Sequence, residues 1–206
     1  MRLYRPLSVL KLVYPEAIFR VNTDRRVLFL TFDDGPDPVT TSGVLGILGD
    51  HKIKATFFCN GSRSEKHPDK MELIISQGHT VGNHGYDHPD GWGTDTGKYI
   101  EDIRKGSEFT SNVLFRPPYG RIRPSQYRFL IRTYRIIFWD IMTYDYDNRM
   151  TPDRILRMLK NRIRPGSVIV FHDKATSSVL SILNDFIIYA TDEGFTFLPL
   201  DGSGKE

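Results

Sequence analysis

The stretch LFLTFDDGPDP, residues 28–38, places two adjacent aspartates directly after an almost wholly apolar run. Residues 28–32 have the character of a strand that is buried on both faces of a parallel sheet. Asp33 and Asp34 follow, and a Gly-Pro pair then marks a turn. Adjacent carboxylates repel each other and are disfavoured at low dielectric. Standing alone they would be explained as a solvated turn, so a functional interpretation requires partners elsewhere in the chain.

Composition indicates an ordinary globular protein. The chain has 206 residues, of which 39% are hydrophobic and 26% are charged, and its formal net charge is +3. This length suits one domain with a full core. The charge is too small, and too evenly mixed in sign, to indicate a nucleic-acid partner. The single cysteine, Cys59, excludes an intrachain disulfide and lies in an apolar run, which predicts a buried thiol.

The N-terminal 25 residues are expected to form a segment that packs on a domain spanning residues 26–206. Arg5, Pro6, Lys11 and Pro15 interrupt its apolar residues. No unbroken apolar stretch therefore reaches the length of a signal peptide or a transmembrane helix. On this basis we expect no transmembrane segment and a cytoplasmic location.

Apolar, strand-like runs alternate with helix-like stretches along the chain. The residues at 178–193 place their apolar side chains on one helical face and end at Gly194, and a second helix is expected after a Thr151 N-cap. This alternation predicts an α/β fold with a barrel-like sheet, in which chemistry lies at the C-terminal ends of the strands. The predicted strands are 26–32, 53–58, 79–82, 113–116, 134–139, 167–171 and 195–200.

Polar or ionisable groups follow five of these strands. Solvated loops would scatter charges over both ends of a sheet, so clustering at one end favours a functional site. The groups are Asp33 and Asp34 after the first strand, Asn83, His84 and His88 after the third, Arg116 after the fourth, Asp140 and Asp145 after the fifth, and His172 and Asp173 after the sixth.

His84 and His88 have the spacing of a metal-binding pair. Four residues apart on a helical turn, both imidazoles would face one side. Such a pair alone is more often incidental, but a carboxylate from a neighbouring strand end would complete three ligands with open positions. That set suits a divalent metal that activates water. One of Asp33 and Asp34 could then be a ligand and the other a base near the cation, and the residues alone do not decide which.

The sequence RPPYG, residues 116–120, predicts a rigid loop. Its first amide after the prolines belongs to Tyr119 and is a candidate oxyanion donor. Arg116 could orient a carboxylate, although a structural turn with Arg116 in a surface ion pair is an equal alternative. His172 could transfer a proton near neutral pH, unless it is only a hydrogen-bonded residue at a strand end. Structural roles are assigned to the remaining histidines, His51, His67 and His79.

Taken together, the chain resembles the polysaccharide deacetylase family, the carbohydrate esterase family 4 group with a NodB homology domain. Five motifs occur in the family's order, and the resemblance extends over nearly the whole chain from about Val27. They are TFDDG at 31–35, HGYDH at 84–88, RPPYG at 116–120, Asp145 with its following aromatic residue, and VFH at 170–172.

The resemblance implies a distorted (β/α)7 barrel, NodB-like, and hydrolysis of N-acetyl, sometimes O-acetyl, groups on a sugar. Two histidines and one carboxylate favour zinc as the metal, and such a mixed site accepts cobalt, nickel or manganese as well. The implied roles are Asp33 as general base, Asp34, His84 and His88 as metal ligands, Arg116 as the residue orienting Asp33, the Tyr119 amide as oxyanion donor, and His172 as general acid tuned by Asp145.

Two positions depart from the family pattern. Tyr146 stands where a tryptophan usually follows the aspartate, which affects the acetyl pocket, and Val170 replaces a leucine. The expected partner is an acetylated oligo- or polysaccharide, with peptidoglycan, chitin oligomers, capsule or lipopolysaccharide sugars and acetylated xylan all open. The family's usual substrates lie in the cell envelope, so the cell envelope is the alternative to the cytoplasmic location. The alternative function is a metal-dependent carbohydrate-binding protein with little turnover.

Overall fold

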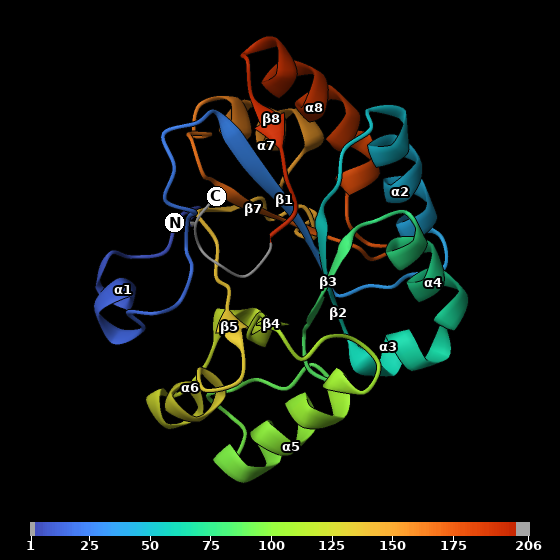
Figure 1. Ribbon diagram of the computed structural model, residues 1–206. Coiled ribbons are helices and arrows are strands. Elements are labelled where there is room, and N and C mark those ends of the chain that lie inside the picture. The colour runs from blue at the N-terminus through green and yellow to red at the C-terminus, as the bar shows by residue number, and fades with distance from the viewer. Residues whose placement is uncertain (1–2, 201–206) are drawn as a thin grey trace.

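A curled parallel sheet runs through the middle of the computed structural model, which describes residues 3–200 (Figure 1). The sheet order is β5-β4-β3-β2-β1-β7-β6, and β8 pairs with β1. Every pairing between these named strands is parallel. The strands are β1 (Val27–Asp33), β2 (Thr56–Cys59), β3 (Thr80–Asn83), β4 (Leu114–Phe115), β5 (Arg135–Ile136), β6 (Ile141–Met142), β7 (Val168–His172) and β8 (Thr196–Phe197).

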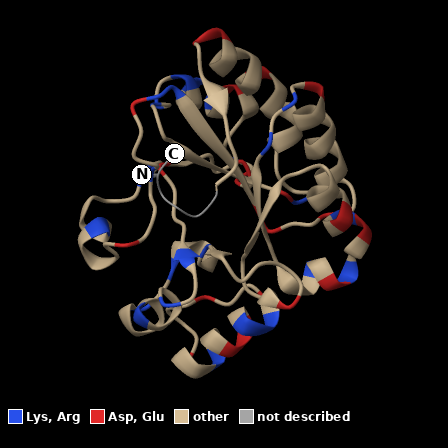
Figure 2. Ribbon diagram, viewed as in Figure 1, with Lys and Arg blue, Asp and Glu red and all other residues tan. Residues whose placement is uncertain are grey.

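Helices surround the sheet on its outer side (Figure 1). Figure 2 shows charged residues of both signs gathered on these helices and on the loops, while the central strands carry few. The helices are α1 (Val9–Val13), α2 (Thr40–Asp50), α3 (Gly61–Lys66), α4 (Pro68–Ser76), α5 (Thr96–Ser107), α6 (Pro124–Leu130), α7 (Pro152–Lys160) and α8 (Leu183–Asp192), with short 3₁₀ turns η1 (Pro118–Gly120) and η2 (Val179–Ser181).

Strand β1 lies at the centre of the core. All seven of its residues are buried, as the apolar run predicts for a central parallel strand. Phe32 stacks on Phe57 of β2 and on Phe171 of β7, with ring centroids 4.9 Å and 5.9 Å away. The packing fixes β1 between its neighbours, and so fixes the position of the aspartates at its end.

The predicted elements are found with shorter boundaries. Each of the seven predicted strands overlaps an observed strand, although β1, β2, β3 and β7 each end one residue later than predicted, and β6 was not predicted. The helix expected over 178–193 begins only at Leu183, because residues 179–181 form the separate turn η2. Helix α7 begins as expected after Thr151, whose side chain accepts a hydrogen bond from the Arg154 amide.

The sheet does not close into a full barrel, which confirms the distorted (β/α)7 architecture. Strands β5 and β6 are its two ends, and the N-terminal segment lies between them. Ile18 forms a parallel bridge with Ile137, and Arg20 forms an antiparallel bridge with Ser167. Phe19 stacks on Phe138 at 4.8 Å. The segment therefore packs on the sheet, while the domain boundary at residues 25 and 26 stays a prediction.

No helix within residues 3–200 is both long enough and apolar enough to cross a bilayer.

Candidate metal centre and catalytic pocket

Asp33 and Asp34 line the same pocket because the backbone turns between them. Consecutive side chains of a strand point to opposite faces. Asp33 is the last residue of β1, but Asp34 has φ 76°, in the left-handed region. This change of backbone direction brings both carboxylates into one pocket at the C-terminal end of the sheet. A left-handed aspartate is uncommon, and such residues cluster at functional sites.

Asp34, His84 and His88 bring three donor atoms together. Oδ1 of Asp34 lies 3.2 Å from Nε2 of His88 and 3.6 Å from Nε2 of His84. The two Nε2 atoms are 3.2 Å apart. The histidines lie in the loop after β3, not on the helical turn that the spacing predicted. Positive φ at Gly85 and at His88, 77° and 59°, bends this loop so that the rings still meet.

The protonation of His84 suits a metal ligand. Nδ1 of His84 lies 2.8 Å from the Arg116 carbonyl oxygen, to which it donates a hydrogen bond. This assignment leaves the lone pair of Nε2 directed at Asp34. Burial lowers the pKa of His84 to about 4, although Asp33 and Asp34 act in the opposite direction. The imidazole is therefore neutral at neutral pH, which is the form that binds metal.

This donor set fits a divalent cation such as zinc. Two imidazole nitrogens and one carboxylate oxygen, all within 4.8 Å of one another, match a three-ligand site that keeps open positions. Burial tends to raise the pKa of Asp34, but its contacts with His88, His172, His84 and Lys174 outweigh burial and lower it. Asp34 therefore carries a negative charge at any physiological pH, as a metal-binding carboxylate would.

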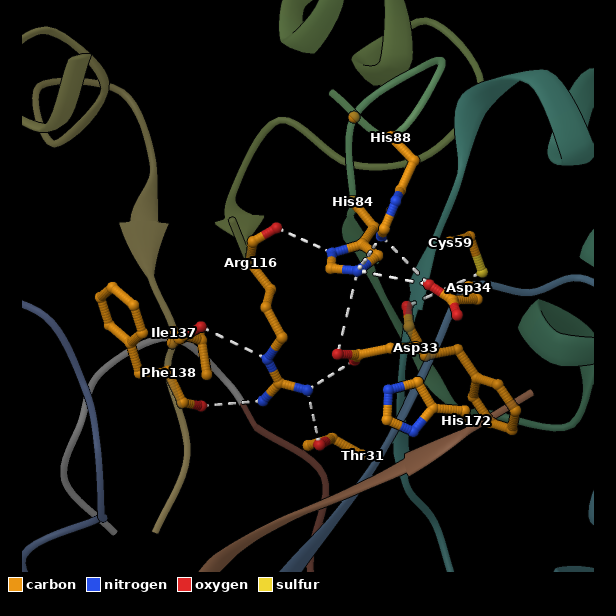
Figure 3. A network of polar contacts seen from close by, with 12 residues as sticks. Thr31, Asp33, Asp34, Cys59, His84, His88, Arg116, Ile137, Phe138 and His172 are labelled. Atoms are coloured by element: carbon orange, nitrogen blue, oxygen red, sulfur yellow. Dashed lines mark hydrogen bonds and ion pairs between the residues drawn. The ribbon is translucent and has the colours of Figure 1, made fainter. Parts of the chain in front are cut away.

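Asp33 is held by the side chain of Arg116, as Figure 3 shows. Nη1 of Arg116 donates to Oδ1 of Asp33 at 2.6 Å, and Oδ2 of Asp33 lies 3.9 Å from Nε2 of His84. Arg116 is completely buried, so the alternative of a surface ion pair is wrong for this residue. Asp33 thus stands beside the three donor atoms with one oxygen fixed and the other directed toward them.

His172 forms a second pair with Asp145 on the same pocket. Its Nδ1 lies 2.7 Å from Oδ1 of Asp145, and its backbone amide donates to Oδ2 at 2.9 Å. Burial tends to lower the pKa of His172, but the charge and hydrogen bond of Asp145 raise it overall. Because Nδ1 is engaged, Nε2 is the nitrogen that remains for a substrate. The ring of Tyr146 lies 4.5 Å from that of His172.

Tyr119 lies at the rim of the pocket in a strained backbone conformation. It sits within η1 with φ 57° and ψ 8°. Among the described residues, four of the five non-glycine positions with positive φ line the pocket, namely Asp34, His88, Tyr119 and Tyr144. Such residues persist where the surrounding structure fixes them, which indicates a preorganised site.

Asp140 does not belong to this site, which corrects the sequence-based grouping. Its backbone amide donates to the Val168 carbonyl, at the start of β7, and its carboxylate binds Arg164 and Ser167. The predicted strand 134–139 is in fact β5 followed by a crossing segment. Asp140 therefore precedes β6 at the opposite end of the sheet, whereas Asp145 follows β6 at the pocket end.

Two further residues, Lys174 in the pocket wall and the buried Asp173 beside His172, were not predicted as site residues. Nζ of Lys174 donates to Oδ2 of Asp34 at 2.6 Å, and Lys174 follows β7 in a loop whose course the sequence pattern does not reveal. Asp173 was noted at a strand end but given no role. It is fully buried, and Oδ2 accepts a hydrogen bond from the Thr41 hydroxyl at 2.5 Å. Only the adjacent motif at His172 could have drawn attention to either residue.

Comparison with known proteins identifies the family. The model of the polysaccharide deacetylase family matches residues 20–131, more than half of the chain. The chain belongs to this family. A peptidoglycan-N-acetylglucosamine deacetylase of Bacillus cereus is 35% identical in an alignment of 150 residues that covers 69% of this chain and 54% of that protein. The chain thus spans about half the length of this relative.

Two other family members extend the comparison. A chitooligosaccharide deacetylase of Rhizobium leguminosarum bv. trifolii is 31% identical and is matched over 73% of both chains. The crystal structure of the Bc1960 peptidoglycan N-acetylglucosamine deacetylase, in complex with an N-hydroxybenzamide, superposes with a TM-score of 0.86. That match has 30% identity and covers 95% of this chain and 94% of the other. The polysaccharide deacetylase fold therefore extends over nearly the whole chain.

Proposed function

We propose that the protein is a metal-dependent hydrolase that removes N-acetyl groups from an amino-sugar polymer. The observation that carries the proposal is the convergence of the Asp34, His84 and His88 donor atoms, with an arginine-held Asp33 beside them and an aspartate-held His172 on the same pocket. A family relationship alone would not suffice, because fold does not determine activity.

Asp34, His84 and His88 would hold the metal. A divalent cation bound there would lower the pKa of water and polarise the acetyl carbonyl group. Zinc suits two imidazoles and one carboxylate, and cobalt, nickel or manganese can occupy the same kind of site.

Asp33 would act as the general base. Its Oδ2 is the oxygen not engaged by Arg116 Nη1, so it is available to take a proton from the attacking water. Arg116 would fix the carboxylate in one orientation without touching substrate. The Tyr119 amide would donate a hydrogen bond to the oxyanion of the tetrahedral intermediate.

His172 would act as the general acid. The amine of a sugar is a poor leaving group, and it must gain a proton as the carbon–nitrogen bond breaks. Nε2 of His172 would deliver this proton, and Asp145 would keep the imidazolium form available by raising the pKa of His172. The products would be acetate and a free amine on the sugar.

For the substrate we propose N-acetylglucosamine units of peptidoglycan. The support is that the Bacillus cereus relative and the protein in the superposed crystal structure are both peptidoglycan N-acetylglucosamine deacetylases by name. A chitooligosaccharide is the second choice, because the Rhizobium relative is named for it. A peptidoglycan substrate would place the protein's action at the cell envelope.

The test is acetate release by the zinc- or cobalt-loaded protein from peptidoglycan, chitooligosaccharides and acetylated xylan, measured in parallel. We expect acetate from an N-acetylated substrate, accompanied by an equal amount of free amine. Saccharide binding without acetate release from any substrate would contradict the hydrolase and favour the carbohydrate-binding alternative.

A further inference from the structure

The loop between the two candidate metal-binding histidines, residues 84–88 and here called the histidine loop, is held by a carboxylate that lies outside the pocket. Asp102 belongs to α5, and its side chain accepts hydrogen bonds from two consecutive backbone amides of this loop. The Tyr86 amide donates to Oδ1 at 2.7 Å, and the Asp87 amide donates to Oδ2 at 3.0 Å. Asp102 does not line the pocket. Its carboxylate therefore serves the backbone between the two histidines rather than a substrate.

Other polar groups of the histidine loop are paired as well. The Gly85 amide donates to Oδ1 of Asn83 at 2.7 Å, and Nδ2 of Asn83 donates in turn to the Ile103 carbonyl oxygen of α5 at 2.8 Å. On its other side the loop meets α3, where the Gly61 amide donates to the Gly85 carbonyl oxygen at 2.8 Å. The loop backbone is thus held between α5 and α3.

The histidine loop also packs closely against α5. A Cβ atom added at Gly106 of α5 would lie 2.9 Å from the carbonyl carbon of Gly85 and 3.0 Å from the amide nitrogen of Tyr86. A Cβ atom added at Gly85 would lie 2.9 Å from Oδ1 of Asp102. Contacts this short leave the loop little room to shift while the hydrogen bonds to Asp102 are intact.

The course of this backbone sets the separation of the two imidazoles. His84 begins the histidine loop and His88 ends it, and their Nε2 atoms lie 3.2 Å apart. A metal that binds donor atoms already in place does not have to order the loop, so whatever fixes the loop raises the affinity for the metal.

We propose that Asp102 is a positioning residue for the candidate metal centre, an inference that rests on the metal site of the proposed function. By accepting from the Tyr86 and Asp87 amides, Asp102 holds His84 and His88 at the separation that a divalent cation requires. Asp102 is not one of the three proposed ligands. Its removal should therefore weaken zinc binding without changing the chemistry of a site that is loaded with zinc.

The experiment measures the zinc dissociation constant of the chelator-stripped protein by competition with a fluorescent zinc indicator. Asp102→Ala should raise this constant roughly 10-fold, the lower end of the effect of groups that support metal ligands, because Asp102 acts through the loop backbone. Asp102→Asn keeps the shape and one acceptor oxygen, so its constant should lie between those of Asp102→Ala and the wild type. At saturating zinc, kcat of both variants should approach that of the wild type, since the proposed ligands are unchanged.

Asp95→Ala is the matched control. Asp95 is the N-cap of the same helix, and its Oδ1 also accepts from two backbone amides, those of Gly97 at 2.9 Å and Lys98 at 3.3 Å. This substitution removes the same charge and a comparable pair of hydrogen bonds, but it leaves the hydrogen bonds of the histidine loop in place. It should lower stability, as the loss of a helix cap does, and leave the zinc dissociation constant unchanged.

Equal zinc dissociation constants in the wild type and Asp102→Ala would overturn the positioning role. An equal change in Asp102→Ala and Asp95→Ala would overturn it as well, because it would reflect lost charge or general destabilisation. Failure of the proposed function is distinguishable: zinc binding that is weakened only in the Asp102 variants, without acetate release from any substrate, would refute the hydrolase and support the positioning role. A wild type that binds no zinc would refute both.

Discussion

Arg116 and Asp33 form a buried ion pair in which the guanidinium group is held in one orientation by further hydrogen bonds. Besides the 2.6 Å contact with Asp33, the guanidinium donates to Thr31 Oγ1 and to the carbonyl oxygens of Ile137 and Phe138. It also lies 4.1 Å from the Phe58 ring centroid. Burial lowers the pKa of Arg116, an effect that its pairing with Asp33 opposes. The arginine can therefore act on a substrate only through Asp33.

The first prediction separates the two adjacent aspartates. Asp33→Asn should retain the metal but lose turnover, because the amide oxygen can still accept from Arg116 but cannot take a proton. Asp34→Asn should lose metal, because it weakens a ligand. Elemental analysis and acetate release on both variants provide the check.

Asp33→Asn also leaves the buried Arg116 without its counter-charge, so we expect the free energy of unfolding to fall by about 3 kcal/mol. Both variants are therefore assayed below their melting temperatures. Wild-type turnover in Asp33→Asn would refute its role as base.

The second prediction concerns the leaving group. His172→Ala should lose roughly 10²–10⁴-fold in kcat/KM on an N-acetyl sugar oligomer, because the departing amine needs a proton. An aryl acetate departs as a stable phenolate and should be affected far less. The measurement is kcat/KM for both substrates on the metal-loaded variant. Equal losses would mean that His172 shapes the site or binds substrate and that another group is the acid.

The third prediction follows from the pair of His172 and Asp145. Asp145 raises the pKa of His172, so the protonated acid persists to higher pH than it would without this partner. Activity should fall as pH rises through this raised pKa. Asp145→Asn should move that fall in kcat/KM to lower pH, since it removes the charge responsible. Asp147→Asn, two residues further along and hydrogen-bonded to Arg149, is the matched control and should keep the wild-type profile. If kcat/KM of Asp145→Asn fell at the same pH as that of the wild type, His172 would not be the acid that Asp145 tunes.

The fourth prediction concerns stability and rests on Asp173. Burial raises the pKa of this carboxyl from 3.8 to about 7, although the Thr41 hydroxyl opposes the shift. Ionising Asp173 therefore costs folded-state stability, which is present below about pH 4 and is lost as pH rises through about 7. The difference corresponds to roughly 4 kcal/mol.

Asp173→Asn cannot ionise and should remove this part of the pH dependence. The measurement is the free energy of unfolding of both proteins from pH 4 to pH 8, with a chelator present so that metal binding does not contribute. Subtracting the two curves cancels the other titrating groups. A difference that stays constant over this range would show that Asp173 does not titrate there.

The sequence could predict the parts of the site that depend on strand ends. The carboxyl ends of parallel strands meet at one edge of a sheet, so motifs that follow β1, β3, β4 and β7 converge without any knowledge of loop structure. That these motifs form one site was therefore predictable from the order of strands and motifs along the chain. The central burial of β1 followed in the same way from its uninterrupted apolar run.

The remainder depended on backbone geometry that no local pattern encodes. Asp140 and Asp145 both follow apolar residues, and only the break between β5 and β6 sends them to opposite ends of the sheet. The histidine loop was expected to be helical, yet it brings the rings together through positive φ at His88. Lys174 reaches Asp34 because of the loop after β7, and contacts between residues 140 positions apart have no signature in a single sequence.

Metal-dependent deacetylation is tested most directly by acetate release from an N-acetylglucosamine oligomer by the chelator-treated protein, before and after zinc is added back. Acetate release should be lost when the metal is removed and should return as zinc approaches one equivalent per chain. His88→Ala, which lacks one ligand, should fail to recover under the same conditions. Full acetate release by the chelated protein, unchanged by zinc, would contradict metal-dependent deacetylation at Asp34, His84 and His88.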